Sequence, residues 1–376
     1  MMTTGRRAQA TPEPSGHRVG ALGENTRGSS PLGWRVFSLR NVGSFLLALV
    51  ALYLVYRQLL GLDWGEVWAS VRGAKAWLFA LAFLIFYCSF PLRALRWETL
   101  LNNIGYSRLV GKPIPSVLGL SRIMYLAWFA NCLTVARLGD VYRGYLLKKQ
   151  AGVSFATTLG TVLAERLLDL IVLVALVGAG VLVVFGGTLP TEATQALIAG
   201  LILSAVGILG LLTMRRFRGV LERLVPKRFR PHYTSLIQGL VGSFRHLPLL
   251  VAYSAIGWLM EGLTLYTTAA AVGAPISVVG ALVVALVGSL LTTVPFTPGG
   301  VGFTEAGLVL MLGWLGLDIP TASAVTLLFR LINYWSIVVL GFILYVFSPN
   351  TNQLSKRRIG MPSVPMRIHR SFIGRS

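Results

Sequence analysis

The sequence predicts an all-α polytopic membrane protein, and three observations support this fold class. Of its 376 residues, 55% are hydrophobic and only 12% are charged, whereas soluble domains carry roughly 25% charged residues. The mean hydropathy is +0.70. Several apolar runs reach the length of about 20 residues that a helix needs to cross a bilayer, and no stretch alternates like a barrel strand. A water-soluble fold is excluded, because so few charges could not cover its surface.

Composition divides the chain into three parts. Residues 1–40 are rich in Gly, Ser, Pro, Thr and Arg, which predicts a disordered, Arg-rich cytoplasmic tail. Residues 41–347 form the predicted transmembrane domain, and residues 348–376 form a second basic cytoplasmic tail. The net charge of +21 lies in tails and short loops, not along one helix stripe. It therefore orients a membrane protein and does not indicate nucleic-acid binding.

About eight hydrophobic segments are expected. Six are predicted to cross the membrane as single helices, over residues 41–60, 77–95, 155–185, 192–214, 247–272 and 320–347. The other two are less regular. One covers residues 117–135, and the other covers residues 278–294 and is followed by a shorter apolar piece over residues 306–317.

The basic loops orient these segments. Residues 92–113, residues 214–247 and the C-terminal tail are Arg-rich and belong on the cytoplasmic side of the membrane, so both termini are cytoplasmic. Residues 114–147 and 275–318 must then each begin and end on one side. This predicts two re-entrant hairpins, although eight plain spans remain an alternative. The second hairpin is broken by helix-disrupting residues, namely Pro295, Pro298, Gly299, Gly300 and Gly302.

A weak internal repeat accompanies the two hairpins. Gly152 precedes Arg166 by the same number of residues as Gly316 precedes Arg330. With hairpins in place, the two arginine-bearing helices cross the membrane in opposite directions. The sequence therefore predicts an inverted repeat, which is common in secondary transporters that bind their cargo where broken helices meet.

Seven ionisable residues are expected at membrane depth, where an unpaired charge costs about 2.5 kcal/mol or more. They are Arg122, Glu165, Arg166, Asp169, Glu261, Glu305 and Arg330. Glu165 and Asp169 are neighbours on one helix face, with Arg166 beside them. This group has a surplus acid, which predicts a partner on another helix, such as Arg330 or Arg143. The group either forms a structural ion-pair network or acts on substrate or protons.

Two loop sequences carry further candidates. Arg137 to Arg143 reads RLGDVYR, which places Asp140 at a helix start between two guanidinium groups suited to phosphate. An alternative role for Arg137 and Arg143 is anchoring at the cytoplasmic interface.

Residues 295–305 read PFTPGGVGFTE, where Thr304 is expected to cap a new helix. Glu305 would then stabilise the first turn, or serve as a coupling or lipid-contacting acid. Glu261 is interpreted as either a proton relay or half of an ion pair. Arg93 and Arg96, beside Trp97, are interpreted as an interfacial anchor.

Motifs for soluble catalysis are missing from the sequence. The two cysteines have no CxxC spacing, the four histidines are scattered, and no P-loop, HExxH or nucleophile elbow occurs. We therefore expect no metal and no cofactor.

Four runs in this chain resemble those of one known family. They are RALRW at 93–97, RLGDVYR at 137–143, AERLLD at 164–169 and PFTPGGVGFTE at 295–305. Together, over roughly residues 40–347, they resemble the lysylphosphatidylglycerol synthase transmembrane region, also called the flippase-like or UPF0104 family. The resemblance implies an inner-membrane, lipid-handling protein, some members of which move an aminoacylated anionic phospholipid between leaflets.

The chain departs from the bifunctional members of that family, which carry a large cytoplasmic synthase domain after the membrane part. Residues 348–376 are too few for such a domain. The resemblance therefore favours the flippase-like half over an enzyme, with membrane lipids, an anionic phospholipid or a polyprenyl-phosphate lipid, as partners and a separate lipid synthase as a candidate partner. In this interpretation the head group is bound by arginines, namely Arg143, Arg166, Arg330, Arg137 and Arg122. The acids pair with these arginines or exchange protons; they are Glu165, Asp169, Glu305, Asp140 and Glu261. An intramembrane enzyme using Glu305 or Asp169 on a glycolipid, and an accessory subunit, are the alternatives.

Overall fold

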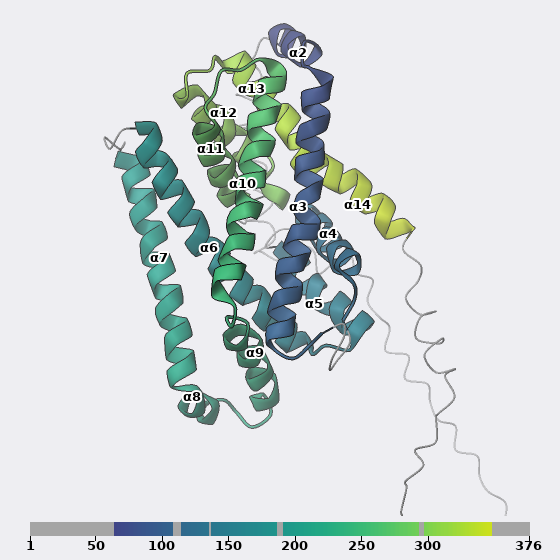
Figure 1. Cartoon of the computed structure of the whole chain (residues 1–376), viewed down its shortest axis with the longest axis vertical. Helices are drawn as coiled ribbons and strands as arrows, with labels where there is room; N and C mark the ends of the chain where they lie inside the picture. The colour runs from purple at the N-terminus through teal and green to yellow at the C-terminus, as the bar shows by residue number, and fades with distance from the viewer. Residues whose placement is uncertain (1–63, 108–113, 135–136, 186–190, 293–296, 348–376) are drawn as a thin grey trace, which may run out of the picture. The chain divides into compact units, whose positions relative to one another are not determined.

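The computed structural model describes residues 64–107, 114–134, 137–185, 191–292 and 297–347, and its regular elements there are helical (Figure 1). This confirms the all-α prediction for these ranges. The α-helices are α2 (Trp64–Arg72), α3 (Ala76–Asn103), α4 (Val117–Leu133), α5 (Leu138–Ala151), α6 (Phe155–Phe185), α7 (Thr191–Arg216), α8 (Arg218–Leu224), α9 (Arg230–Gly242), α10 (Leu247–Val272), α11 (Val278–Leu291), α12 (Phe303–Trp314), α13 (Ile319–Arg330) and α14 (Ser336–Val346). The predicted span 41–60, Pro295 and both predicted tails lie outside the described residues.

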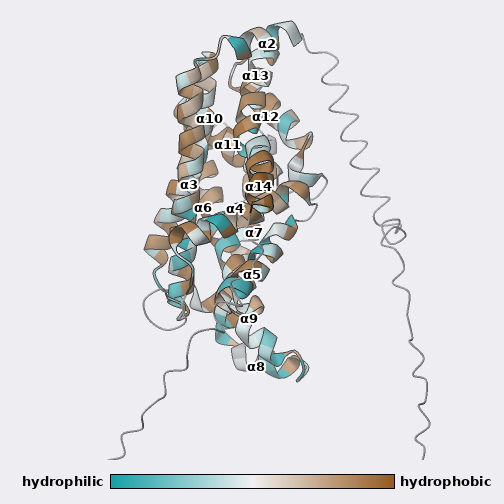
Figure 2. Ribbon diagram, turned by 90° about the vertical axis from the view of Figure 1, so that its right-hand side faces the viewer, coloured by the Kyte–Doolittle hydropathy of each residue, from teal (hydrophilic) through white to brown (hydrophobic). Residues whose placement is uncertain are grey.

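Within the described residues, five helices are long and apolar enough to cross a membrane. They cover Ala76–Asn103, Phe155–Val184, Leu197–Arg216, Leu247–Val272 and Ile319–Val346. They correspond to five of the six predicted single spans. Figure 2 shows that α14 is mostly hydrophobic, whereas α8 contains hydrophilic as well as hydrophobic residues. The chain therefore has the helices of a multi-pass membrane protein.

The two irregular segments are each broken into two short helices. α4 and α5 are separated by residues 134–137, and we call this pair hairpin 1. α11 and α12 are separated by residues 292–302, and we call this pair hairpin 2. In hairpin 2 the helices pack antiparallel, because Leu291 lies against Gly307 and Gly280 lies against Leu315. The predicted breaks are therefore present.

The same local features recur in both hairpins. Ser116 and Ser277 cap α4 and α11, and each side chain accepts a hydrogen bond from the backbone N–H three residues later. The N-cap residues of α5 and α12, Arg137 and Gly302, have φ values of 53° and 87°. Such positive φ values are unfavourable for a residue with a Cβ, so Arg137 is held there by its surroundings.

Close glycine contacts hold the helices together. A Cβ on Gly139 would lie 1.9 Å from the carbonyl oxygen of Ala127, so α5 can approach α4 only with glycine there. α6 and α9 cross in the same way, since a Cβ on Gly239 would lie 2.1 Å from the carbonyl oxygen of Thr157. These contacts fix the start of α6, where the charged residues described below begin.

The last long helix contains a defect in its middle. Residues Leu331–Trp335 form a π-helical turn between α13 and α14. Ser336 donates a hydrogen bond to the carbonyl of Ile332, and the hydroxyl of Tyr87 on α3 lies 2.7 Å from that of Ser336. Single π-turns inside α-helices are frequent at functional sites. This one places Tyr334 beside the tips of both hairpins.

We predict that Gly239→Val destabilises the protein by about 1–3 kcal/mol, because the added side chain overpacks the crossing of α9 and α6. The free energy of unfolding in detergent, measured by SDS titration, tests this. Gly210→Val on α7 is the matched control, because a Cβ at Gly210 meets no atom within 4 Å. Equal stability of the two variants would contradict the tight crossing.

Candidate functional site

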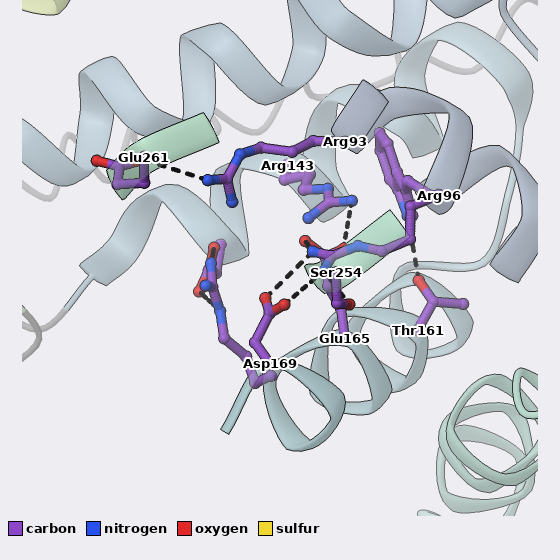
Figure 3. A network of polar contacts seen from close by, with 11 residues as sticks. Arg93, Arg96, Arg143, Thr161, Glu165, Asp169, Ser254 and Glu261 are labelled. Carbon is purple, nitrogen blue, oxygen red and sulfur yellow. Dashed lines mark hydrogen bonds and ion pairs between the residues drawn. The ribbon is translucent and has the colours of Figure 1, made fainter. Parts of the chain in front are cut away.

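Arg96 on α3 lies at the centre of a buried ion-pair network (Figure 3). Its guanidinium forms a bidentate pair with Asp169 and contacts Glu165 at 2.8 Å, both from α6. It also donates to the hydroxyl of Ser254 on α10 at 2.7 Å. The side chains of Arg96 and Glu165 are 2% and 3% exposed. One arginine therefore ties three membrane helices together.

Arg143 on α5 joins the same network from the other side. It forms an ion pair with Glu165 at 2.8 Å, and its guanidinium carbon lies 3.7 Å from the ring centroid of Trp97. The indole N–H of Trp97 in turn donates to Thr161 at 3.3 Å. Arg143 is thus the partner that the sequence allowed for the surplus acid. It has a buried, aromatic-stacked position that stabilises the contact of α5 with α3 and α6.

Arg93 pairs with Glu261 across the contact of α3 and α10, at 3.3 Å. Its guanidinium also lies over the rings of Trp128 and Trp258, at 5.0 and 5.4 Å. Glu261 is therefore half of an ion pair, which is one of the two interpretations drawn from the sequence. The pair links α3 to α10, and because both partners are almost fully buried, loss of either would leave the other charge buried without its partner.

An equivalent arginine–carboxylate pair closes each hairpin. In hairpin 1, Arg166 on α6 donates from Nε and Nη2 to the two oxygens of Asp140, at 3.1 and 2.8 Å. In hairpin 2, Arg330 donates from Nε to Glu305 at 2.6 Å. Both acids lie in the first turn of the hairpin's second helix, and both arginines lie on the following long helix. The two pairs therefore occupy matching positions.

Glu305 also fixes the tip of hairpin 2. Its other oxygen accepts from the backbone N–H of Gly302 at 2.5 Å, so Gly302 is the N-cap of α12. This corrects the prediction that Thr304 caps the helix. The helix begins earlier, because a glycine with φ of 87° can turn the chain there. Glu305 does stabilise the first turn, as expected.

Tyr334, in the π-helical turn, connects the two tips. Its hydroxyl donates to the carbonyl of Cys132 at the end of α4, at 3.2 Å. A Cβ on Gly299 would lie 2.3 Å from its ring, so the tip of hairpin 2 packs directly against the ring. Arg330 lies over the same ring at 4.5 Å and donates to the carbonyl of Gly299 at 3.2 Å.

A cavity of about 280 Å³ lies between these tips. Its polar wall contains Arg93, Arg137, Arg166, Arg330, Asp169 and Glu261. Its apolar wall includes Leu170, Leu173, Leu290, Phe329 and Ile337. The wall therefore carries more positive than negative charge, and it combines this charge with an apolar surface. Such a wall suits an amphipathic molecule with an anionic end.

The cavity includes some of the predicted site residues and not others. Arg137, Arg166, Arg330, Asp169, Glu261, Gly299 and two neighbours of the broken loop, Thr292 and Thr304, line it. Arg122 on α4, Arg143, Glu165, Asp140 and Glu305 are not among its lining residues. Gly300, Gly302 and Pro298 shape the tip of hairpin 2 from outside the lining. Within the described residues, no group of His, Cys, Asp and Glu could hold a metal ion.

The sequence interpretation of Arg93 and Arg96 was wrong. They are not interfacial anchors, because both are buried and ion-paired, at 6% and 2% exposure. The apolar run ends near Leu95, but α3 continues to Asn103. The signal that could have identified them is their spacing. Arg93, Arg96 and Trp97 share one face of a continuing helix, opposite the acids of α6 and α10.

The helices and the buried charges define the class of this molecule: it is a multi-pass helical membrane protein with an internal charged cavity. Residues 41–341 match the model of the lysylphosphatidylglycerol synthase TM region. The chain belongs to this family, as the sequence motifs predicted. This family model covers only the transmembrane region of lysylphosphatidylglycerol synthase.

Several relatives of this chain are named UPF0104 membrane proteins. The chain is 34% identical to the UPF0104 membrane protein of Methanocaldococcus jannaschii, over 58% of this chain and 93% of the relative. It is 26% identical to one from Methanothermobacter thermautotrophicus, over 73% of this chain and 84% of the relative. It is also 26% identical to glycosyltransferase AglD of Haloferax volcanii, over 75% of this chain but only 50% of that protein.

We predict that Arg96→Ala destabilises the protein by about 3–5 kcal/mol, because it leaves Glu165 and Asp169 buried without their shared partner. The free energy of unfolding by SDS titration, with the monodisperse fraction on gel filtration, tests this. Arg223→Ala is the control, because Arg223 is exposed on α8. A loss no larger than that of the control would contradict the central role of Arg96.

Proposed function

We propose that this chain is a flippase-like lipid transporter. It moves a lipid with an anionic head group, an anionic phospholipid or a polyprenyl-phosphate-linked lipid, between the leaflets of a plasma membrane. The observation that carries the proposal is the cavity between the hairpin tips, where Arg137, Arg166 and Arg330 meet an apolar wall. Guanidinium groups suit anionic oxygens, and the apolar wall suits the adjoining hydrocarbon.

The proposal gives the charged residues separate tasks. Arg166, Arg330 and Arg137 bind the head group, since they line the cavity. Arg143 and Arg122, which the sequence also assigned to the head group, do not line the cavity; Arg143 supports the site through its pair with Glu165. Glu165, Asp169, Asp140, Glu305 and Glu261 hold the arginines in place, and Asp140 and Glu305 are the candidates for proton coupling because their side chains are 19% and 29% exposed.

Both hairpins are re-entrant in this proposal. α4–α5 enters from the cytoplasm and α11–α12 enters from the opposite side, so that the halves form an inverted repeat with both termini cytoplasmic. Support comes from the recurring caps, first-turn acids and arginine pairs of the two hairpins. Non-helical backbone at membrane depth is tolerated only inside protein or beside a wet cavity, and both tips border the cavity.

A second candidate function is an enzyme or accessory subunit in glycolipid or cell-envelope lipid synthesis. The relative named glycosyltransferase AglD favours it, although the match covers half of that protein. A separate lipid-synthase partner would fit either function. Incubation of the purified chain with lipid substrates discriminates the two candidates, because an enzyme changes the mass of a lipid and a transporter changes only its leaflet.

Transport is tested in vesicles with leaflet-labelled anionic lipid. We expect Arg166→Ala to lower the flipping rate at least about tenfold, since a charged hydrogen bond contributes roughly 1.5–3 kcal/mol. Arg223→Ala on exposed α8 is the control and should keep the wild-type rate. Wild-type flipping by Arg166→Ala would remove the proposed role of this arginine.

The topology is tested by cysteine labelling in a background without Cys88 and Cys132. Leu118→Cys and Gln150→Cys mark the two ends of hairpin 1, and Val278→Cys and Trp314→Cys mark those of hairpin 2, at exposed positions. We expect an impermeant thiol reagent added outside the cell to label only the hairpin 2 pair. Labelling of one end of a hairpin but not the other would mean that it spans the membrane.

A further inference from the structure

Several polar groups of the cavity wall lack hydrogen-bond partners among the described residues. Thr304 on α12 is only 2% exposed, and its hydroxyl has no partner. The indole N–H of Trp258 on α10 also has none. Both residues line the cavity. Buried donors without partners cost about 1–3 kcal/mol each, so a ligand with several acceptor oxygens would relieve this cost.

The two hairpin arginines offer further donors to the same cavity. Arg166 donates hydrogen bonds from Nε and Nη2 to Asp140. Arg330 donates from its Nε to Glu305 and from its Nη2 to the carbonyl of Gly299. In both arginines Nη1 lies outside these contacts. The arginines line the cavity but the two acids do not, so each carboxylate sits behind its arginine.

We propose that Arg166, Arg330, Thr304 and Trp258 form one phosphate-binding subsite, in which Asp140 and Glu305 orient the arginines as counter-ions from behind. Its ligand is the phosphate of a lipid with a small head group. The four donors come from four different helices, α6, α13, α12 and α10, and line the same cavity, and a tetrahedral phosphate has oxygens directed to several sides. This inference rests on the proposed use of the cavity for an anionic head group, but it does not require transport.

The size of the cavity further restricts which ligands fit. Its volume of about 280 Å³ lies just below the range of roughly 300–1,000 Å³ for drug-sized ligands. A phosphate and the first atoms of a glycerol or prenyl chain fit such a space. The apolar wall, including Leu170 and Leu290, would contact the atoms next to the phosphate.

Isothermal titration of the detergent-purified full chain tests the subsite. The probes are dihexanoyl phosphatidic acid, inorganic phosphate and dihexanoyl phosphatidylcholine. We expect the lipid phosphate to bind about tenfold tighter than inorganic phosphate, as burial of two further CH₂ groups would give. Equal affinities for phosphatidic acid and inorganic phosphate would overturn the proposal that the ligand is a lipid and would leave free phosphate as the ligand. Tighter binding of phosphatidylcholine than of phosphatidic acid would overturn the proposal that the head group is small.

The variants give opposite shifts. Arg330→Gln and Arg166→Gln should each weaken binding of the lipid phosphate about tenfold or more. Glu305→Gln and Asp140→Asn should instead strengthen it about threefold, because they remove a competing negative charge. The single amide oxygen keeps one hydrogen bond from the arginine, and the second contact of the carboxylate, from Gly302 N–H or from Arg166 Nη2, is lost in the variant. A purely structural ion pair would not produce opposite shifts. Unchanged affinity in the arginine variants, or weaker binding in both acid variants, would overturn the proposal.

Matched controls separate binding from folding. Asp318→Asn neutralises an exposed acid at the N-cap of α13, outside the cavity, and should leave the affinity unchanged. Arg330→Lys keeps the charge but loses the planar fork, so a folded Arg330→Lys protein should still bind more weakly. Wild-type affinity in this variant would count against the subsite.

The same proteins in vesicles separate the two proposals. Phosphate binding with the expected shifts, but without lipid movement, would overturn transport and keep the subsite. Lipid movement that Arg330→Gln leaves unchanged would overturn the subsite and keep transport.

Discussion

The structure depends on pairing arginines with carboxylates where little water is present. Isolated charges at membrane depth are costly, and a carboxylate that loses its partner there is strongly destabilising. In the described residues, five arginines balance five acids in the pairs around Arg96, Arg93, Arg143, Arg166 and Arg330. Each of these pairs joins residues from different helices. The charges thus specify which helices are neighbours, whereas apolar packing alone would allow many arrangements.

This charge pairing also explains the two kinds of arginine in the chain. Arg96 and Arg143 have their charge satisfied within the helix packing, and they do not line the cavity. Arg166 and Arg330 are held from one side by an acid in a helix first turn, and they face the cavity with the other. The pairing of arginine with carboxylate therefore has two roles: it holds the helices together, and it orients arginines toward a cavity that suits an anion.

Much of the fold followed from the sequence, because a long apolar run has few structural options in a membrane. The spans at α6 and α10, the breaks of both hairpins and the dense group at Glu165 and Asp169 were predicted. The buried position of Arg96 was not predicted, because the hydropathy of α3 falls before the helix ends, and this fall suggested that Arg96 lies at the membrane–water interface. Nor could the cavity be predicted, since its wall is assembled from helices distant in sequence. Pair distances such as that between Arg93 and Glu261 depend on packing that no local pattern encodes.

The π-helical turn at Leu331–Trp335 has a consequence for how this chain can change over evolutionary time. Such a turn holds one residue more than an α-helical turn, and each residue rotates a helix by about 100°. Deleting a single residue there would leave a helix still able to span the membrane. It would nevertheless rotate Tyr334 relative to α14, away from Cys132 and Gly299. An alignment gap of one residue in this helix would therefore mark a change of cavity shape among relatives, even where every lining residue type is retained.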